Sequence, residues 1–268
     1  MRVKQSGTKS RGSLKVLGIF CGIVLVAIIA SLFYRLIGLM ETSKYDSSHT
    51  FLLAFAYKSD LDIFALRPHG EMSSHLIIRG APSLSVARQT AGVIPDTIIT
   101  LPKSLGDLEQ VSRVLFDGAI KGGLKTDLTS YDLMRLSYTT KRFPPRLLQT
   151  EELQVPKGGD ELSPPQDFFS DQVISQENKS IAIINGTGIP GLGTRLEEAI
   201  VRLGGNVISV TNASEDQDHS QISYTGEKSY TVTHLSLLFG ISPTLSAQAG
   251  LSDIIVLIGK DKSSIIPY

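Results

Sequence analysis

Four glycines between residues 186 and 193 form the pattern in this sequence that most clearly suggests a binding site. Gly186, Gly188 and Gly191 spell G-x-G-x-x-G, and Gly193 follows two residues later. An apolar run precedes them and apolar residues at a 3–4 spacing follow, so a strand should lead through a glycine turn into a helix. Backbone amides at such a helix N-terminus can bind a pyrophosphate.

Two observations favour a purely structural turn. A dinucleotide site has an acidic residue at the end of the next strand, whereas here Val210 leads to Thr211 and Asn212. The surrounding segment is also too short for the two halves of a dinucleotide-binding fold. We therefore predict that the glycines serve the turn and bind no cofactor. At least one should have a positive φ or lie too close to a neighbouring strand for a Cβ.

Other candidate groups give weaker signals. Asp60 and Asp62 lie two apart on an expected strand and so point to one face, which on an exposed hairpin is usually a solvated edge. No acyl-transfer G-x-S-x-G motif occurs. The histidines show no metal-ligand spacing, and we expect no metal site; they are His49, His69, His75, His219 and His234.

The elements around these residues form a mixed α/β pattern in two parts. Residues 50–142 predict a small α/β domain. Its strands should lie near residues 51–57, 61–66, 74–78 and 97–101, and its helices near 85–92, 105–119 and 128–138. Residues 180–268 predict a compact α/β sandwich with three to four strands and two helices. Its strands should lie near residues 181–184, 206–210, 221–225 and 252–259, and its helices near 192–203 and 232–239.

Residues 143–179 differ in composition from both parts. Five prolines, a Gly158-Gly159 pair and many acids interrupt every apolar period. This composition predicts a disordered or extended linker. Limited proteolysis should then cut first within about residues 145–178 and release a folded C-terminal fragment.

The N-terminus predicts a membrane anchor. Residues 1–15 carry five basic residues and no acid, and residues 16–39 carry no charge until Arg35. About 20 apolar residues suffice to cross a bilayer, and the basic flank favours a cytoplasmic N-terminus. A cleaved signal peptide would have only a poor site at Ala30-Ser31-Leu32, and a lipoprotein anchor would need a small residue where Phe20 precedes Cys21.

The charge and the cysteine content argue against nucleic-acid binding, disulfides and thiolate metal sites. The whole chain is neutral, but residues 40–268 hold 20 basic and 26 acidic residues, a net charge of −6. Such a segment gives no electrostatic reason to expect nucleic acid. Cys21 is the single cysteine, so no disulfide and no thiolate metal site can form outside the apolar segment, which suits a bacterial exported protein.

Residues 180–262 resemble a known family. The stretches NGTGIPGLGTRLEEAIVRLGGNVISVTNA, SQISYTG and DIIVLIGKD are similar to the C-terminal domain of LytR/CpsA/Psr proteins. The resemblance implies a bacterial cell-envelope location. Members of the family commonly combine this domain with a membrane helix and a catalytic domain. That catalytic domain transfers glycopolymers from a polyprenyl pyrophosphate carrier to peptidoglycan.

Residues 50–142 resemble a reduced form of that catalytic domain at two places. Lys58-Ser59-Asp60 followed by LDIFALRP is similar to the family's Arg-Ser-Asp segment. Ile78 and Gly80 stand where the family has a proline and an aspartate, so the sequence departs from the family pattern at these two positions. The resemblance implies that arginines would bind the two phosphates and that a carboxylate would hold Mg²⁺ or take a proton. The candidates are Arg67, Arg79 and Arg88 for the phosphates, and Asp60 or Asp62 for the carboxylate.

Two functions follow as expectations. In the first, the chain is a membrane-anchored envelope protein with a non-catalytic binding or assembly role in cell-wall biogenesis. Its partners would be the lipid bilayer and a wall glycopolymer or envelope protein. In the second, residues 50–142 form a divergent, Mg²⁺-dependent phosphotransferase for polyprenyl-pyrophosphate-linked glycopolymers. The two differ in whether the arginines and Asp60 converge on one pocket.

Overall fold

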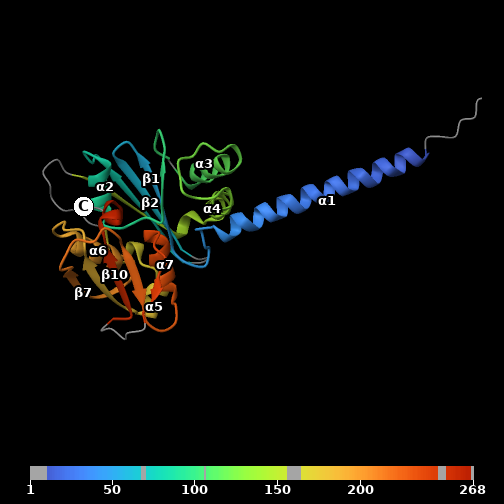
Figure 1. Cartoon of the computed structure of the whole chain (residues 1–268). Coiled ribbons are helices and arrows are strands. Elements are labelled where there is room, and N and C mark those ends of the chain that lie inside the picture. The colour runs from blue at the N-terminus through green and yellow to red at the C-terminus, as the bar shows by residue number, and fades with distance from the viewer. Residues whose placement is uncertain (1–10, 68–70, 106, 156–163, 247–251, 267–268) are drawn as a thin grey trace, which may run out of the picture. The chain divides into compact units, whose positions relative to one another are not determined.

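A computed structural model of the chain describes residues 11–67, 71–105, 107–155, 164–246 and 252–266. The structure divides into two units, Met1–Ser43 and Lys44–Tyr268 (Figure 1). The first unit contains one helix, α1 (Arg11–Glu41). Within it, Leu17–Met40 is long and apolar enough to cross a membrane, with a mean hydropathy of 2.6. A signal sequence near the N-terminus would meet the same criterion.

The second unit begins with an N-terminal lobe, residues 44–155, built on a five-stranded mixed sheet in the order β4-β1-β2-β3-β5. Strands β1 (Phe51–Tyr57), β2 (Asp60–Leu66) and β3 (Ser73–Arg79) run antiparallel, and a tight turn joins Tyr57 to Asp60. Strand β4 (Thr97–Thr100) lies parallel to β1 at one edge, and β5 (Leu148–Gln154) lies parallel to β3 at the other.

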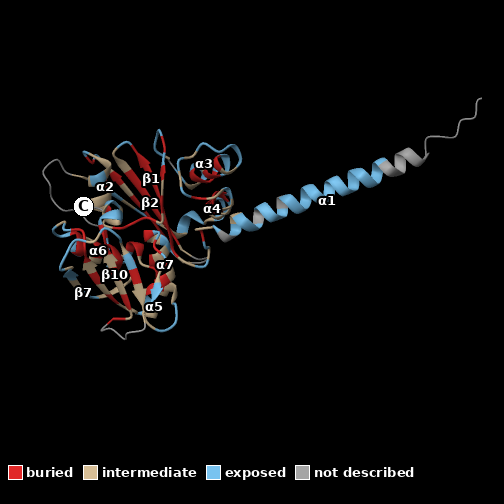
Figure 2. Cartoon of the chain, in the orientation of Figure 1, coloured by how far each residue is buried: buried red, intermediate tan, exposed pale blue. Residues whose placement is uncertain are grey.

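Helices cover both faces of this sheet. Helix α2 (Leu84–Ala91) packs on the face that includes Leu61 and Ile63. Helices α3 (Leu108–Lys121) and α4 (Ser130–Arg142) pack on the opposite face, against Leu53 and Phe55 among others. Strand β1 is therefore buried along its whole length, as Figure 2 shows for the centre of the sheet. The predicted strands and helices of this part are all present.

The C-terminal lobe, residues 164–266, carries a second five-stranded sheet in the order β7-β6-β10-β8-β9. Both its long helices pack on one face, which makes a two-layer α/β sandwich. Four predicted strands are present, and β9 is a fifth that the sequence did not signal because it has only two residues. The strands are β6 (Ser180–Asn185), β7 (Asn206–Asn212), β8 (Gln221–Tyr224), β9 (Thr244–Leu245) and β10 (Ile254–Ile258). The helices are α6 (Leu192–Arg202), α7 (Tyr230–Phe239) and the 3-10 helix η3 (Lys260–Ile265). The α/β fold class is confirmed.

The expected linker over residues 143–179 is wrong for its described residues. It contains two 3-10 helices, η1 (Pro145–Leu147) and η2 (Gln166–Phe169), the edge strand β5 and helix α5 (Gln172–Glu177). An edge strand tolerates acids because one side faces solvent, and the prolines stand just outside or at the start of regular elements. Residues 156–163, with Pro156 and the Gly158-Gly159 pair, lie outside the described residues.

One apolar core joins the two lobes. It contains strand residues of the N-terminal lobe together with four buried residues of the C-terminal lobe, Phe168, Phe169, Ile174 and Leu203. Conversely, Ile94 of the N-terminal lobe belongs to the core of the C-terminal sandwich. The lobes therefore form one compact unit, and the segment between them is part of that unit's core.

Candidate functional site

Arg67 acts as a clamp within the protein. Its guanidinium donates to the carbonyl oxygens of Met72 at 2.5 Å, Asp167 at 3.1 Å, Phe168 at 3.1 Å and Ser170 at 3.4 Å, and to the Ser74 hydroxyl at 3.2 Å. These acceptors come from the β2–β3 region and from the segment that precedes α5. Arg67 therefore holds that segment against the sheet.

Arg79 and Asp62 form an ion pair on neighbouring strands. Arg79 donates to the two carboxylate oxygens of Asp62 at 2.6 and 3.3 Å, and the Asp62 side chain is only 1% exposed. The structure thus corrects the solvated edge that we expected for Asp62, because Arg79 and Tyr57 enclose its carboxylate. Burial raises the pKa of Asp62, although Arg79 favours its ionised form.

Asp60 lies at the same end of the sheet and accepts a hydrogen bond from the Gly80 amide at 3.1 Å. Gly80, which stands where the family has an aspartate, has a φ of +73°. Glycine adopts such a positive φ at the least cost. The backbone conformation at residue 80 therefore favours a glycine.

The third arginine, Arg88, lies on α2 and donates to the Ile265 carbonyl at 2.7 Å. Its buried Nε has no partner among the described residues, and burial lowers the pKa of its guanidinium. Arg67 directly follows the last residue of β2 and is five residues from Asp62, which is about 16 Å at the usual rise of an extended chain. The structure brings Arg79 together with Asp62 and Asp60, and brings neither Arg67 nor Arg88 to them.

Protein groups lie close to three of the four glycines in the turn between β6 and α6, which are Gly186, Gly188 and Gly193. Gly188 and Gly191 have φ values of +72° and +78°, and a Cβ on Gly186 would lie 2.8 Å from the Gln217 side chain and 3.1 Å from the Ile258 carbonyl. The Asn185 side chain accepts from the Thr187 amide at 3.1 Å and donates to the Ile189 carbonyl at 2.9 Å. The prediction that the turn needs positive φ or a close approach is confirmed.

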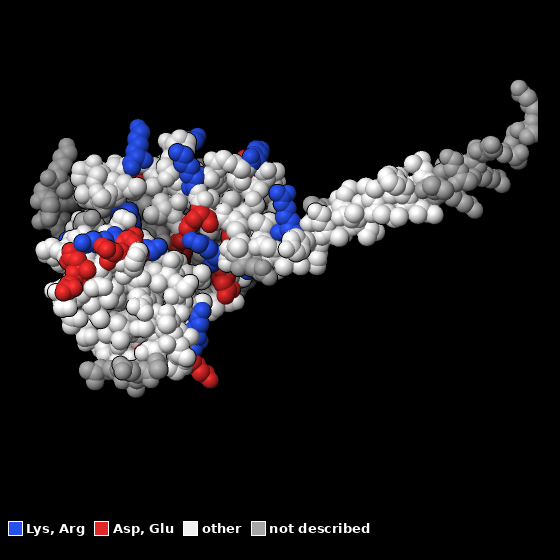
Figure 3. Space-filling model, in the orientation of Figure 1, with Lys and Arg blue, Asp and Glu red and all other residues white. Residues whose placement is uncertain are grey.

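A cavity between the lobes brings together residues that no motif singled out. Its volume is about 270 Å³. On the face shown in Figure 3, charges of both signs gather in a band between the upper and lower parts of this unit. The cavity is lined by Lys44, Asp46, His49, Thr50, Phe51, Asp96, Tyr230, Thr233, His234 and Leu237.

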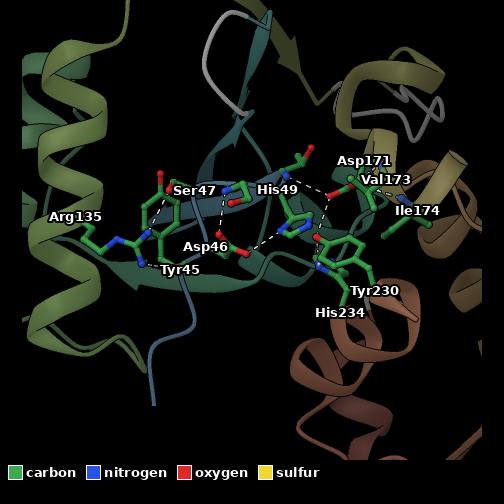
Figure 4. Close-up of polar contacts among 12 residues, drawn as sticks. Tyr45, Asp46, Ser47, His49, Arg135, Asp171, Val173, Ile174, Tyr230 and His234 are labelled. Atoms are coloured by element: carbon green, nitrogen blue, oxygen red, sulfur yellow. Dashed lines mark hydrogen bonds and ion pairs between the residues drawn. The ribbon is translucent and has the colours of Figure 1, made fainter. Parts of the chain in front are cut away.

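Tyr230 and His234, which line the cavity, form a hydrogen-bonded series with the side chain of Asp171 (Figure 4). The Tyr230 hydroxyl lies 3.1 Å from Asp171 Oδ2 and 3.2 Å from His234 Nδ1. An ionised carboxylate can only accept, so Tyr230 donates to Asp171 and His234 Nδ1 donates to Tyr230. Asp171 also accepts from the Thr50 amide at 3.2 Å and caps α5. The series thus joins residues of both lobes.

His49 lies beside this series. Its ring stacks on Tyr230 with a centroid distance of 3.9 Å, and its Nδ1 lies 2.8 Å from Asp46 Oδ2. Burial raises the pKa of the Tyr230 hydroxyl, and the nearby Asp171 carboxylate raises it further. Tyr230 therefore stays protonated and keeps its place as a donor.

Asp96 faces His234 across the cavity. Asp96 Oδ2 accepts from the Leu52 amide at 2.7 Å, and Oδ1 lies 3.7 Å from His234 Nε2, too far for a direct hydrogen bond. His234 Nε2 is buried and has no hydrogen-bond partner among the described residues. Burial raises the pKa of Asp96. Sequence reasoning missed this pair because Asp96 and His234 lie far apart in the chain and in no recognisable spacing.

The described residues contain no cluster of side chains suited to a metal ion. In the parts of the chain that the structure describes, no group of three or more His, Cys, Asp or Glu side chains could hold a metal ion. The absence of a metal site therefore remains an expectation for the complete chain.

Comparison with known proteins found one family model that matches the C-terminal lobe. The family model described as LytR cell envelope-related transcriptional attenuator matches residues 178–261. These residues form a LytR-type C-terminal domain. The match confirms the resemblance and associates the protein with the cell envelope. The LytR-type domain includes the glycine turn, Tyr230 and His234, whereas Asp96 and the candidate arginines lie outside it. No curated protein and no solved structure matches the chain.

Proposed function

We propose that this protein is a membrane-anchored component of the bacterial cell envelope that binds or assembles wall material and does not transfer it. The LytR-type domain supports the envelope context, and the apolar α1 helix supports the anchor. The observation that carries the non-catalytic assignment is the separation of Arg67, Arg79 and Arg88, each bound to groups of the protein itself.

The chemistry of pyrophosphate transfer explains why this separation matters. Negative charge builds up on the phosphate oxygens as the bond breaks, so several cationic donors must converge on them. Here the Asp62 carboxylate neutralises Arg79, and backbone carbonyls use the donors of Arg67. Arg67 cannot bind a pyrophosphate without first breaking these contacts, and the ion pair with Asp62 offsets the positive charge that Arg79 would offer.

The topology belongs to the same proposal. The N-terminus is cytoplasmic, α1 spans the membrane once, and residues 40–268 lie outside the cytoplasm, with the lipid bilayer and a wall glycopolymer or envelope protein as partners. Protease added to intact spheroplasts should digest residues 40–268 and leave a short membrane-bound fragment. Full protection of the chain would refute the orientation.

A pair of assays on the full-length protein in lipid nanodiscs tests the role. The protein should co-sediment with purified wall sacculi that carry their glycopolymer. It should release no carrier from a polyprenyl-pyrophosphate glycan in the presence of Mg²⁺. Carrier release that Arg79→Ala abolishes would instead support the divergent phosphotransferase.

A further inference from the structure

We propose that the cavity between the lobes is a binding site for a neutral sugar ring, one hydroxyl of which bridges His234 and Asp96. The inference rests on the proposed function, because it names the chemical class of wall material that the protein would bind. The proposed site is the cavity lined by Lys44, Asp96, His234 and their neighbours, and none of the candidate transferase residues lines it.

The bridging position follows from the unpartnered nitrogen. His234 Nδ1 donates to Tyr230, so Nε2 is the atom that faces Asp96 Oδ1 across 3.7 Å. If His234 is protonated, Nε2 donates and the carboxylate accepts. If the proton is instead on Asp96, the roles are reversed.

A hydroxyl fits either arrangement because it donates one hydrogen bond and accepts another. An ammonium group could only donate, and an ether oxygen could only accept. A buried imidazole nitrogen without a partner is costly, so a group that pairs with it contributes to binding. When one proton is shared between His234 Nε2 and Asp96, the residue pair therefore selects a hydroxyl.

The charges around the cavity favour a neutral ligand. Lys44 pairs with Asp127 at 2.5 Å, Asp46 lies 2.8 Å from His49, and Asp96 faces His234. Each cationic or titratable basic group thus has an acidic neighbour. A phosphate or an ammonium ligand would have to displace one of these partners.

The size and the walls of the cavity favour one ring. A volume of about 270 Å³ is slightly below the usual range for small-molecule pockets and suits a single ring better than a chain. Phe51, Leu237 and the stacked pair of His49 and Tyr230 provide apolar and aromatic surface. Sugar rings combine apolar C–H faces with hydroxyl edges, which matches this division between apolar walls and the polar His234–Asp96 end.

The test is a titration of the full-length protein in sugar-free lipid nanodiscs. The probes are N-acetylglucosamine, cationic glucosamine and anionic glucose 6-phosphate, with binding followed by calorimetry and by ligand-observed NMR. We expect the neutral sugar to bind at least about tenfold more tightly than either charged probe, which corresponds to about 1.4 kcal/mol.

Two variants locate the site. Asp96→Asn places an amide opposite His234 and should weaken binding of the neutral sugar at least about tenfold. Leu237→Trp should block the cavity without touching the hydrogen-bonded series, and it should fold because Leu237 is 50% exposed. Its matched control is Leu245→Trp, at an exposed position on β9 away from the cavity lining, which should bind like the wild type.

The outcomes separate this inference from the proposed function. Co-sedimentation with sacculi but no sugar binding would overturn the inference and leave the proposed function standing. Loss of both would overturn both. Sugar binding that Asp96→Asn and Leu237→Trp leave unchanged, or a preference for the phosphorylated sugar, would also overturn the inference.

Discussion

His75 lies on β3 with its ring stacked on Phe64 at a centroid distance of 3.9 Å. Its Nε2 is buried without a hydrogen-bond partner among the described residues. Burial, reinforced by the positive charge of Arg79, lowers the pKa of His75 to about 4. The imidazole is therefore neutral in the folded protein at neutral pH, where it serves as a flat packing group.

This shift predicts a pH dependence of stability. The unfolded chain binds the proton near pH 6.5, whereas the folded chain binds it only near pH 4. Stability should therefore fall as the pH drops from about 6.5 to about 4, by at most about 3 kcal/mol, and this contribution should level off below that range. Urea unfolding of the full-length protein and of His75→Phe at several pH values measures the difference, which should grow in favour of the variant at lower pH.

Other titrating groups affect both proteins alike, so the comparison isolates His75. His219→Gln, at a histidine outside both lobe cores, is the control and should follow the wild type. Parallel curves for wild type and His75→Phe would contradict the assigned environment.

The glycine turn predicts a graded response to alanine. At Gly186 a Cβ would meet the Gln217 side-chain stem at 2.8 Å and a backbone carbonyl at 3.1 Å, so Gly186→Ala should destabilise the fold by about 2 kcal/mol or more. Gly191 has a positive φ but open space around its Cβ position, so Gly191→Ala should cost only about 1 kcal/mol. Thermal melts followed by circular dichroism measure both effects.

The same thermal melts are repeated with added pyrophosphate. If the turn is structural, added pyrophosphate should leave the melting temperatures of wild type and variants unchanged. A ligand-induced rise in the wild type that either substitution removes would identify a phosphate site instead.

At the scale of elements, Arg67 makes several of the polar contacts that hold the segment before α5 to the sheet. Arg67 reaches four carbonyl oxygens and one hydroxyl from two separate parts of the chain. The planar fork of a guanidinium can serve acceptors on several sides at once, which a lysine ammonium cannot reproduce. Helix α5 and the buried Phe168–Phe169 pair follow directly in the chain, so this clamp fixes where they enter the core.

Arg67→Lys should therefore destabilise the protein by about 2 kcal/mol, since several carbonyls, two of them partly buried, lose their donors. Arg113→Lys is the control, because among the described residues the ion pair of Arg113 is an exposed one with Glu109 on α3, and the change should alter stability by less than about 0.5 kcal/mol. Chemical denaturation measures both. Unchanged stability in Arg67→Lys would return Arg67 to the list of candidate phosphate ligands.

At the scale of the whole molecule, the shared core predicts a single cooperative unfolding transition for Lys44–Tyr268. Leu203 belongs to the C-terminal lobe by sequence but is 2% exposed within the core of the N-terminal sheet. Leu203→Ala should cost about 2–4 kcal/mol and lower hydrogen-exchange protection in both sheets together. Val201→Ala, at a 40% exposed position of α6, should change neither sheet by a comparable amount.

Loss of hydrogen-exchange protection confined to β6–β10 in Leu203→Ala would show two independent domains.

The shared core also affects proteolysis. Backbone hydrogen bonds of β5 and α5 and the buried side chains of η2 protect most of the described part of residues 145–178. The early cleavage that composition predicts for this stretch is therefore not expected at those elements.

Several features of this protein follow from the sequence alone. The apolar run of α1, the apolar runs of β1–β3 and the strand–turn–helix at the glycines each have a local pattern or a local turn residue. Local backbone geometry determines these patterns, so they can be recognised without knowing what packs against them. The LytR-type domain was recognisable because its residues form nearly continuous stretches.

Only the tertiary structure determined the rest. Polar, proline-rich residues 143–179 contain an edge strand and a core helix because Phe168, Phe169 and Ile174 find an apolar surface that the sequence does not place near them. Asp62 is buried because Arg79 on the next strand supplies its counter-charge. The cavity depends on Asp96 and His234, which chain folding alone brings to 3.7 Å. Such contacts join residues far apart in the chain, and no local spacing records them.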